Sequence, residues 1–140
     1  MADVFISYKT ESSLELVEHT IVPAIEAAGF KCWYAKRDSR HGLYAGNIKR
    51  AIGNCHIFLL VLDKAALHAQ HIKSETALAF RRLSEGEQIT LIPFSVDGTK
   101  VREDDDLDFF LNCLQSIDGN PPDEKHIHDL INTISAILTF

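Results

Sequence analysis

Glu75 lies at the border of an apolar helical face, where a glutamate is a better candidate for chemistry than on a solvated face. Basic and apolar side chains share its stripe on a helical wheel or flank it: His68, His71, Ile72, Leu78, Ala79 and Arg82. A carboxylate at the border of an apolar face can stabilise positive charge that develops beside it and can accept strong hydrogen bonds. The pattern leaves one alternative open, a surface glutamate paired with Arg82 or Lys73.

Polar side chains also follow the expected strands. Ser7, Tyr8 and Lys9 lie at the end of the first strand, the stretch 35–38 follows the second, and Asp63 ends the third. In a parallel sheet covered by helices, ligands bind beyond the carboxyl ends of the strands. We therefore expect a ligand crevice there, although these charges could instead be solvated loop residues that serve interfaces.

Several common sites are absent from the sequence. It contains no G-x-G-x-x-G after the first strand, no G-x-x-x-x-G-K-[ST], no H-E-x-x-H and no C-x-x-C. A phosphate-receiving domain would need clustered acidic residues where Ser7-Tyr8-Lys9 stands. His68 and His71 lack a third ligand at a set spacing, so we predict no metal site, and residues 104–106 read as a solvated acidic run without chemistry.

Length and composition indicate one globular domain. The chain has 140 residues and a formal net charge of −6, which argues against a general nucleic-acid binder. It contains neither a signal-peptide pattern nor an apolar run of the ~18 residues that a membrane span needs. Its three cysteines favour no disulfide framework, and Cys32 and Cys55 border apolar runs as small core residues do. We expect a cytoplasmic protein without membrane contact.

Short apolar runs alternate with helical patterns along the chain. Strands are expected at residues 4–8, 31–35, 57–62, 89–96 and 113–117, and helices at 12–28, 48–52, 70–83 and 123–138. This alternation predicts an α/β fold, a flavodoxin-like, doubly wound five-stranded parallel sheet flanked by helices. Residues 36–42 and 97–108 read as loops, and Trp33 as a side chain packed against the sheet.

Local signals refine these boundaries. Ser12 and Glu15 form a capping-box pattern at the start of the first helix, and Gly29 closes it. Pro23 predicts a kink or break near residues 19–22. Pro93 should lie near the end of its strand or at an unpaired edge, because proline cannot donate a ladder hydrogen bond.

An ordered set of motifs resembles the TIR (Toll/interleukin-1 receptor) domain family. The opening D-V-F-I-S-Y at 3–8 is similar to its first strand, and W-Y-A-K-R-D at 33–38, with Gly42 beyond it, to its second strand and BB loop. The resemblance covers residues 3–97 well and the remainder by pattern. It implies a single TIR domain over residues 1–140, or the amino-terminal part of a longer effector with a fused or partner nucleotide-sensing domain.

Many TIR domains cleave NAD⁺ with a glutamate in the helix after the third strand, and Glu75 occupies that place. The resemblance therefore implies an NAD⁺ glycohydrolase or ADP-ribosyl cyclase in immune or antiphage signalling, with NAD⁺ as substrate and no cofactor. Nicotinamide leaves as a neutral molecule, so what needs stabilising is the positive charge on the ribose. Nothing in the sequence decides between ADP-ribose and a cyclic isomer.

The expected topology brings further side chains, from the ends of the first two strands, to the same crevice. Lys9 or Arg37 would bind the pyrophosphate, Tyr8 would offer a stacking face, and Asp38 lies at the same crevice. His71 stands where active relatives usually carry an aromatic residue, often tryptophan. The 36–46 loop is also where the family makes TIR–TIR contacts, so self-association competes with substrate binding as its role.

Two other functions remain open. A non-catalytic scaffold that signals by TIR–TIR contact is favoured by the missing tryptophan, whereas Glu75 favours the enzyme. A deoxyribosyltransferase-like use of nucleotide-sugar substrates shares the fold.

Overall fold

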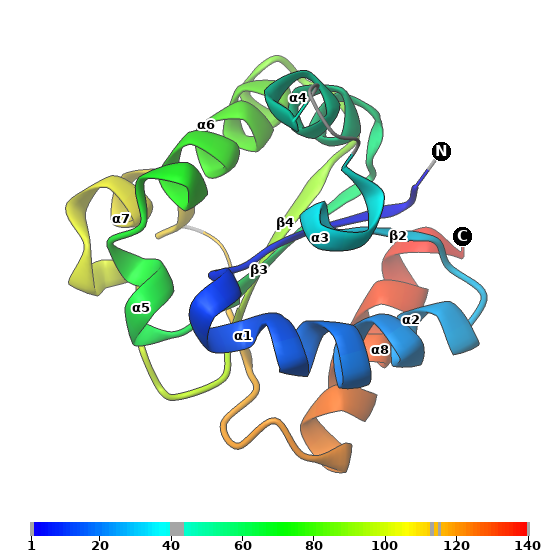
Figure 1. The fold of residues 1–140 in the computed structure, drawn as a ribbon. Helices are drawn as coiled ribbons and strands as arrows, with labels where there is room; N and C mark the ends of the chain where they lie inside the picture. The colour runs from blue at the N-terminus through cyan, green and yellow to red at the C-terminus, as the bar shows by residue number, and fades with distance from the viewer. Residues whose placement is uncertain (1, 40–43, 113, 115, 140) are drawn as a thin grey trace.

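A computed structural model describes residues 2–39, 44–112, 114 and 116–139 of the chain. Five strands form one all-parallel sheet in the order β2-β1-β3-β4-β5: β1 Val4–Ser7, β2 Cys32–Trp33, β3 Ile57–Leu62, β4 Thr90–Ser95 and β5 Ile117–Asp118. Helices cover both faces of the sheet (Figure 1). The predicted flavodoxin-like, doubly wound fold is confirmed.

The central strands are buried because both of their faces are apolar. Every residue of β3 is buried, as a strand covered by helices on both sides requires. Side chains alternate along β1, so Val4 and Ile6 join one apolar cluster and Phe5 joins the other. Ser7, two residues after Phe5, therefore belongs to the face that carries the second cluster.

The helices divide between these two faces. Helices α1 Thr10–Leu16, α2 Val22–Ala27 and α8 Glu124–Leu138 lie on the first face, and α4 Tyr44–Asn54, α6 Gln70–Ser84 and α7 Asp105–Leu111 on the second (Figure 1). The short helix α5 Lys64–Leu67 connects β3 to α6. Helices α6 and α8 match the predicted ranges, and Asp123 caps α8 by accepting the His126 N–H at 3.0 Å. No helix in the described part of the chain is long and apolar enough to cross a membrane.

The first helical region has the predicted irregularity. A π-helical segment, Val17–Ile21, separates α1 from α2, because Pro23 has no N–H to donate to the preceding turn. Gly29 follows the helix with a φ of 98°, as predicted. The predicted capping box is wrong: α1 begins at Thr10, and Lys9, not Ser12, is its N-cap.

The second strand is shorter than predicted, and a helical turn, α3 Ala35–Asp38, replaces the start of the expected loop. The Asp38 carboxylate closes this turn by accepting the Tyr34 N–H at 3.0 Å. Trp33 stacks on Phe5 with ring centroids 5.1 Å apart, which confirms its packing against the sheet. His41 and Gly42 of the expected loop lie outside the described residues.

Pro93 lies in the middle of β4, opposite Leu60 of β3. The Thr90 and Val96 N–H groups donate toward β3. N–H groups alternate between the two sides of a strand, and Pro93 is an odd number of residues from both, so its nitrogen faces the β5 side. Within the described residues, β5 pairs with β4 only at Phe94 and Ser95. The predicted position near the end of the strand or at an unpaired edge is wrong, because β4 lies between β3 and β5 in the sheet. β5 begins later than the predicted strand, whose Cys113 lies outside the described residues.

The prediction of a loop at 97–108 is wrong. The stretch contains the 3₁₀ turn η2 Val101–Glu103 and the start of α7. Asp104 is buried rather than solvated: it caps α7 by accepting the Leu107 N–H at 3.1 Å and pairs with Lys73 at 3.0 Å. Capping and ion pairing compensate the burial of this carboxylate.

Candidate active site

Glu75 projects from α6 into the protein and not into solvent. Its residue is 8% exposed, and its Oε1 accepts a 2.8 Å hydrogen bond from the Ser7 hydroxyl at the carboxyl end of β1. The surface alternative is wrong, because the two cations proposed as its partners are paired elsewhere. Arg82 binds Glu87 at 2.7 Å, and Lys73 binds Asp104.

Local sequence explains this placement. Ile72, Thr76 and Ala79 are the fully buried positions of α6, so the helix packs with this face against the sheet. Glu75 lies beside that face and over the end of β1, where alternation presents Ser7. Glu75, at the predicted border of the apolar face of α6, thus contacts Ser7, the polar residue at the end of β1.

The environment of Glu75 changes its acidity. Burial raises the pKa of the carboxyl above 4.5, its ordinary value, while the Ser7 hydrogen bond and the nearby His71 act in the opposite direction. The ionised form therefore lacks the water that would normally solvate it. Such a carboxylate interacts strongly with any positive charge that enters its cavity.

Tyr8 and His71 lie beside the glutamate. His71 is one helical turn before it, and its Nε2 is 3.2 Å from the Tyr8 carbonyl oxygen. The Tyr8 ring is buried and lies 6.3 Å from the Tyr34 ring, in a tilted arrangement. Lys9 is directed outward, with its Nζ 3.3 Å from the Glu11 carboxylate.

The space at this point is small. A cavity of about 20 Å³ is lined by residues from β1, α1, α3 and α6: Phe5, Ile6, Tyr8, Thr10, Ala35, His71 and Glu75. That volume holds roughly one water molecule. The cavity in this form is too small for a dinucleotide.

Arg37 and Asp38 are engaged away from this cavity. Arg37 forms two 3.1 Å hydrogen bonds with Glu26 of α2 and one of 2.9 Å with Asp38, and its guanidinium lies 4.9 Å from the centre of the Tyr34 ring. Asp38 lines a different hollow, next to Trp33. The structure thus brings Tyr8, His71 and Glu75 together but does not bring Arg37 and Asp38 to them. Substrate roles for these two residues remain predictions.

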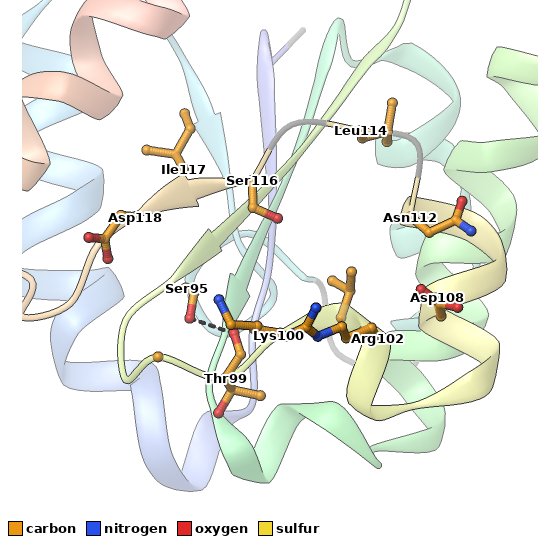
Figure 2. A pocket seen from close by; sticks show the side chains of 12 residues that line it. Ser95, Thr99, Lys100, Arg102, Asp108, Asn112, Leu114, Ser116, Ile117 and Asp118 are labelled. Carbon is orange, nitrogen blue, oxygen red and sulfur yellow. Dashed lines mark hydrogen bonds between the residues drawn. The ribbon is translucent and has the colours of Figure 1, made fainter.

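A larger hollow lies elsewhere, between the carboxyl end of β4, η2 and β5 (Figure 2). It measures about 550 Å³, and the Ser95 hydroxyl donates to the Thr99 carbonyl oxygen at 2.7 Å on its wall. Lys100, Arg102 and Asp118 also line it, but Glu75 does not. Glu75 is the stronger candidate for an active site, because a buried carboxyl with a shifted pKa is a stronger sign of chemistry than an open hollow of mixed charge.

Other reactive groups do not form competing sites. Burial raises the pKa of the Cys32 thiol to about 12 and that of Cys55 to about 11, so both are poor nucleophiles. In the described ranges, no group of three or more His, Cys, Asp or Glu side chains could hold a metal ion.

Ser7 is the functional candidate whose contact sequence reasoning missed. The sequence placed it at a strand end but gave no sign that it binds Glu75, because 68 residues separate the two. The signal in the sequence was Ser7 itself, a polar residue on the same face of the strand as Phe5 in an otherwise apolar run.

Comparisons with known proteins agree with this fold. Over 135 residues the chain is 28% identical to the stimulator of interferon genes protein of Magallana gigas, a match that covers 94% of this chain and 31% of that protein. The chain thus spans about a third of the length of this curated relative.

Two solved structures are similar over nearly the whole chain. A metazoan TIR-STING receptor from C. gigas, in complex with 2′,3′-cGAMP, has a TM-score of 0.76 and 28% identity, and the match covers 96% of this chain and 40% of that one. The TIR domain of the Toll-related receptor TRR-2 from Hydra magnipapillata has a TM-score of 0.68 and 26% identity, over 96% and 98%. The sequence profile of the TIR domain family matches residues 4–131, and the chain therefore belongs to the TIR domain family.

Proposed function

We propose that this TIR domain cleaves NAD⁺ between the ribose and nicotinamide, with Glu75 as the catalytic carboxylate. The observation that carries the proposal is the burial of Glu75 beside Tyr8 and His71, at the carboxyl end of β1. The family includes NAD⁺-cleaving members, and this position matches their glutamate. Participation in immune signalling, in the cytoplasm, belongs to the same proposal.

The chemistry follows from the charge on the substrate. The C1′–nitrogen bond breaks and its electron pair leaves with nicotinamide, which departs neutral and needs no proton. Positive charge then develops on the ribose ring, and the ionised Glu75 stabilises it. Water that attacks C1′ loses one proton and gives ADP-ribose, whereas attack by a nitrogen or hydroxyl of the same molecule gives a cyclic isomer.

The remaining substrate contacts follow the crevice. Tyr8 and His71 would contact the ribose and its leaving group, because both line the cavity with Glu75. Lys9 would bind the pyrophosphate from the rim. Arg37 and Asp38 would join only after they leave Glu26 and the Tyr34 backbone.

Self-association would open the site. The cavity of about 20 Å³ is too small for a dinucleotide, so α3, whose Ala35 lines it, would have to move when substrate binds. TIR–TIR contacts through the 36–46 loop would stabilise the open form. The TIR-STING receptor from C. gigas, solved with 2′,3′-cGAMP, suggests that a fused or partner nucleotide-sensing domain could bring copies together.

The closed cavity also favours a second candidate function. A TIR domain whose site never opens would act as a scaffold, through TIR–TIR contacts without catalysis. The two functions share the fold and differ in whether NAD⁺ is consumed.

Incubation of concentrated protein with NAD⁺, with nicotinamide followed by chromatography, separates them. Wild type should release nicotinamide, and Glu75→Gln and Glu75→Ala should lose at least ~100-fold of the rate. Glu15→Gln, at an exposed position of α1, is the control and should keep wild-type activity. Equal rates for wild type and both Glu75 variants would refute the assignment, and a silent wild type, even when clustered artificially, would favour the scaffold.

A further inference from the structure

The protein contains two buried serine–carboxylate hydrogen bonds of the same length. Ser7 donates to Glu75 at 2.8 Å, and Ser13 of α1 donates to Asp63 at 2.8 Å. All four residues are buried. Only the first pair includes a residue that lines the cavity of the candidate site, so the second is a natural control for it.

The second pair has a structural explanation. Asp63 follows β3 and caps α5 by accepting the Ala66 N–H at 2.7 Å. Its hydrogen bond from Ser13 therefore ties α1 to the start of that helix. The Ser7 bond links β1 to α6 but caps no helix, because Glu75 lies inside α6.

Ser7 is rigidly held. It is 1% exposed, and its backbone pairs with Leu60 of the central strand β3. Its hydroxyl thus presents a fixed donor to a carboxylate that sits on a neighbouring helix. A hydrogen bond from such a donor selects one orientation of the acceptor and favours its ionised form.

We propose that Ser7 is a positioning residue that orients the Glu75 carboxylate and keeps it ionised against its burial. The inference rests on the proposed NAD⁺ cleavage for its catalytic consequence, but the hydrogen bond itself exists whatever the activity. Among the residues that the structure describes, the titratable side chains that line the cavity with Glu75 are His71 from its own helix and Tyr8 from the end of β1. Thr10 and Ala35, from α1 and α3, complete the cavity and do not titrate.

Ser7→Ala, Ser7→Thr and Ser13→Ala test the proposal together. Ser7→Ala should lower kcat for nicotinamide release about tenfold or more, the effect of losing a hydrogen bond to a charged group, with KM little changed. The acid limb of its pH–rate profile should move to higher pH. Ser7→Thr, which keeps the hydroxyl, should restore most of the rate. Ser13→Ala should stay within about twofold of wild type and show how much a generic loss of stability contributes.

A second measurement does not depend on activity. With side-chain carboxyl carbons of glutamate labelled with ¹³C, the Glu75 titration can be followed by NMR in wild type and in each variant, after thermal melting has verified folding. The midpoint should rise in Ser7→Ala but not in Ser13→Ala. An unmoved midpoint, or equal losses of kcat in the two alanine variants, would overturn the role of Ser7. If wild type releases no nicotinamide, the proposed function fails, and the titration alone decides whether Ser7 sets the charge of Glu75.

Discussion

Burial of the Glu75 side chain disfavours the ionised form of its carboxyl group. Its pKa in the folded protein is raised by burial above 4.5, whereas in the unfolded chain water solvates it. The folded state therefore binds the proton more tightly than the unfolded state. The contribution of this group to stability is fully present below pH ~4.5 and is lost as the pH rises through the folded pKa.

Glu75→Gln should therefore stabilise the protein at neutral pH. Glutamine has nearly the same shape, its amide oxygen can still accept the Ser7 hydroxyl, and no charge remains to be buried. Thermal melting should give a higher Tm for the variant than for wild type at pH 7.5, and the difference should shrink toward pH 4. A variant that melts below wild type at pH 7.5 would contradict the burial argument.

At the residue scale, sequence could predict the position of Glu75 at the border of an apolar helical face but not the partner of its carboxylate. The apolar stripe of the helix and the order of the family's motifs both indicated Glu75, because both can be read along the chain without knowing how it folds. The contact with Ser7 depends on how α6 crosses β1, which no local pattern encodes. Arg37 was assigned to substrate because it follows a strand end, yet it contacts Glu26 of α2, an element brought near only by the fold.

At the element scale, the packing of β5 against β4 depends on a missing side chain. A Cβ added at Gly119 would lie 2.5 Å from the Cζ atom of Phe94, whose ring is fully buried. Gly119→Ala should therefore lower the free energy of unfolding by about 1–3 kcal/mol, as overpacking does. Urea denaturation measures the change.

Gly53→Ala is the matched control. Gly53 lies in α4, and a Cβ there would meet nothing within 4 Å. The substitution should stabilise the helix by up to about 1 kcal/mol, because alanine loses less backbone entropy than glycine. If both variants lost the same stability, the close approach at Gly119 would not be the cause.

Asp104 should stabilise the start of α7 far more than its acidic neighbour. Asp104→Ala removes the helix cap and the contact with Lys73, and should cost about 1–2 kcal/mol of unfolding free energy. Asp106→Ala removes only an exposed partner of Lys73 and should stay within about 0.5 kcal/mol.

The acid dependence of Asp104 has the opposite sign to that of Glu75. Burial raises the pKa of Asp104, but the Leu107 N–H and Lys73 more than offset it and hold the pKa below its usual 3.8. The stability it contributes is thus present above pH ~3.8 and is lost as the pH falls through the lowered pKa. Chemical denaturation at pH 7 and near pH 3 should show the gap between wild type and Asp104→Ala narrowing in acid.

Elements with a long hydrophobic period were predictable from sequence. α6 and α8 were assigned nearly to the residue because burial of one helical face imposes a period, and β3 because burial of both faces imposes a continuous apolar run. α7 was missed because its first residues are acidic, and an aspartate run such as the one at Asp104 is as typical of a loop as of a helix N-cap. The Ser12–Glu15 pattern failed because α1 starts directly at the end of β1, before the expected cap.

At the scale of the whole molecule, the proposed cleavage requires a change of shape. The cavity of about 20 Å³ is far smaller than NAD⁺, so substrate would bind to a more open form than this one. Fusion to a protein that oligomerises should raise the rate of nicotinamide release per domain by at least ~10-fold over the monomer at equal domain concentration. A rate per domain that is independent of assembly would exclude gating by self-association.

The fold class was fully predictable because alternating apolar runs and helical periods leave few parallel topologies. The closure of the site was not, because it results from packing between α3, α6 and the end of β1, which lie far apart in sequence.

The pH dependence of nicotinamide release by clustered wild-type protein is the most direct measurement of the central claim. If an ionised, buried Glu75 stabilises the cationic ribose, the rate should rise with pH along a limb centred above 4.5, the usual value for glutamate, and Glu75→Gln should show no such limb. A rate that is flat from pH 4 to pH 7, or the same limb in both proteins, would contradict it.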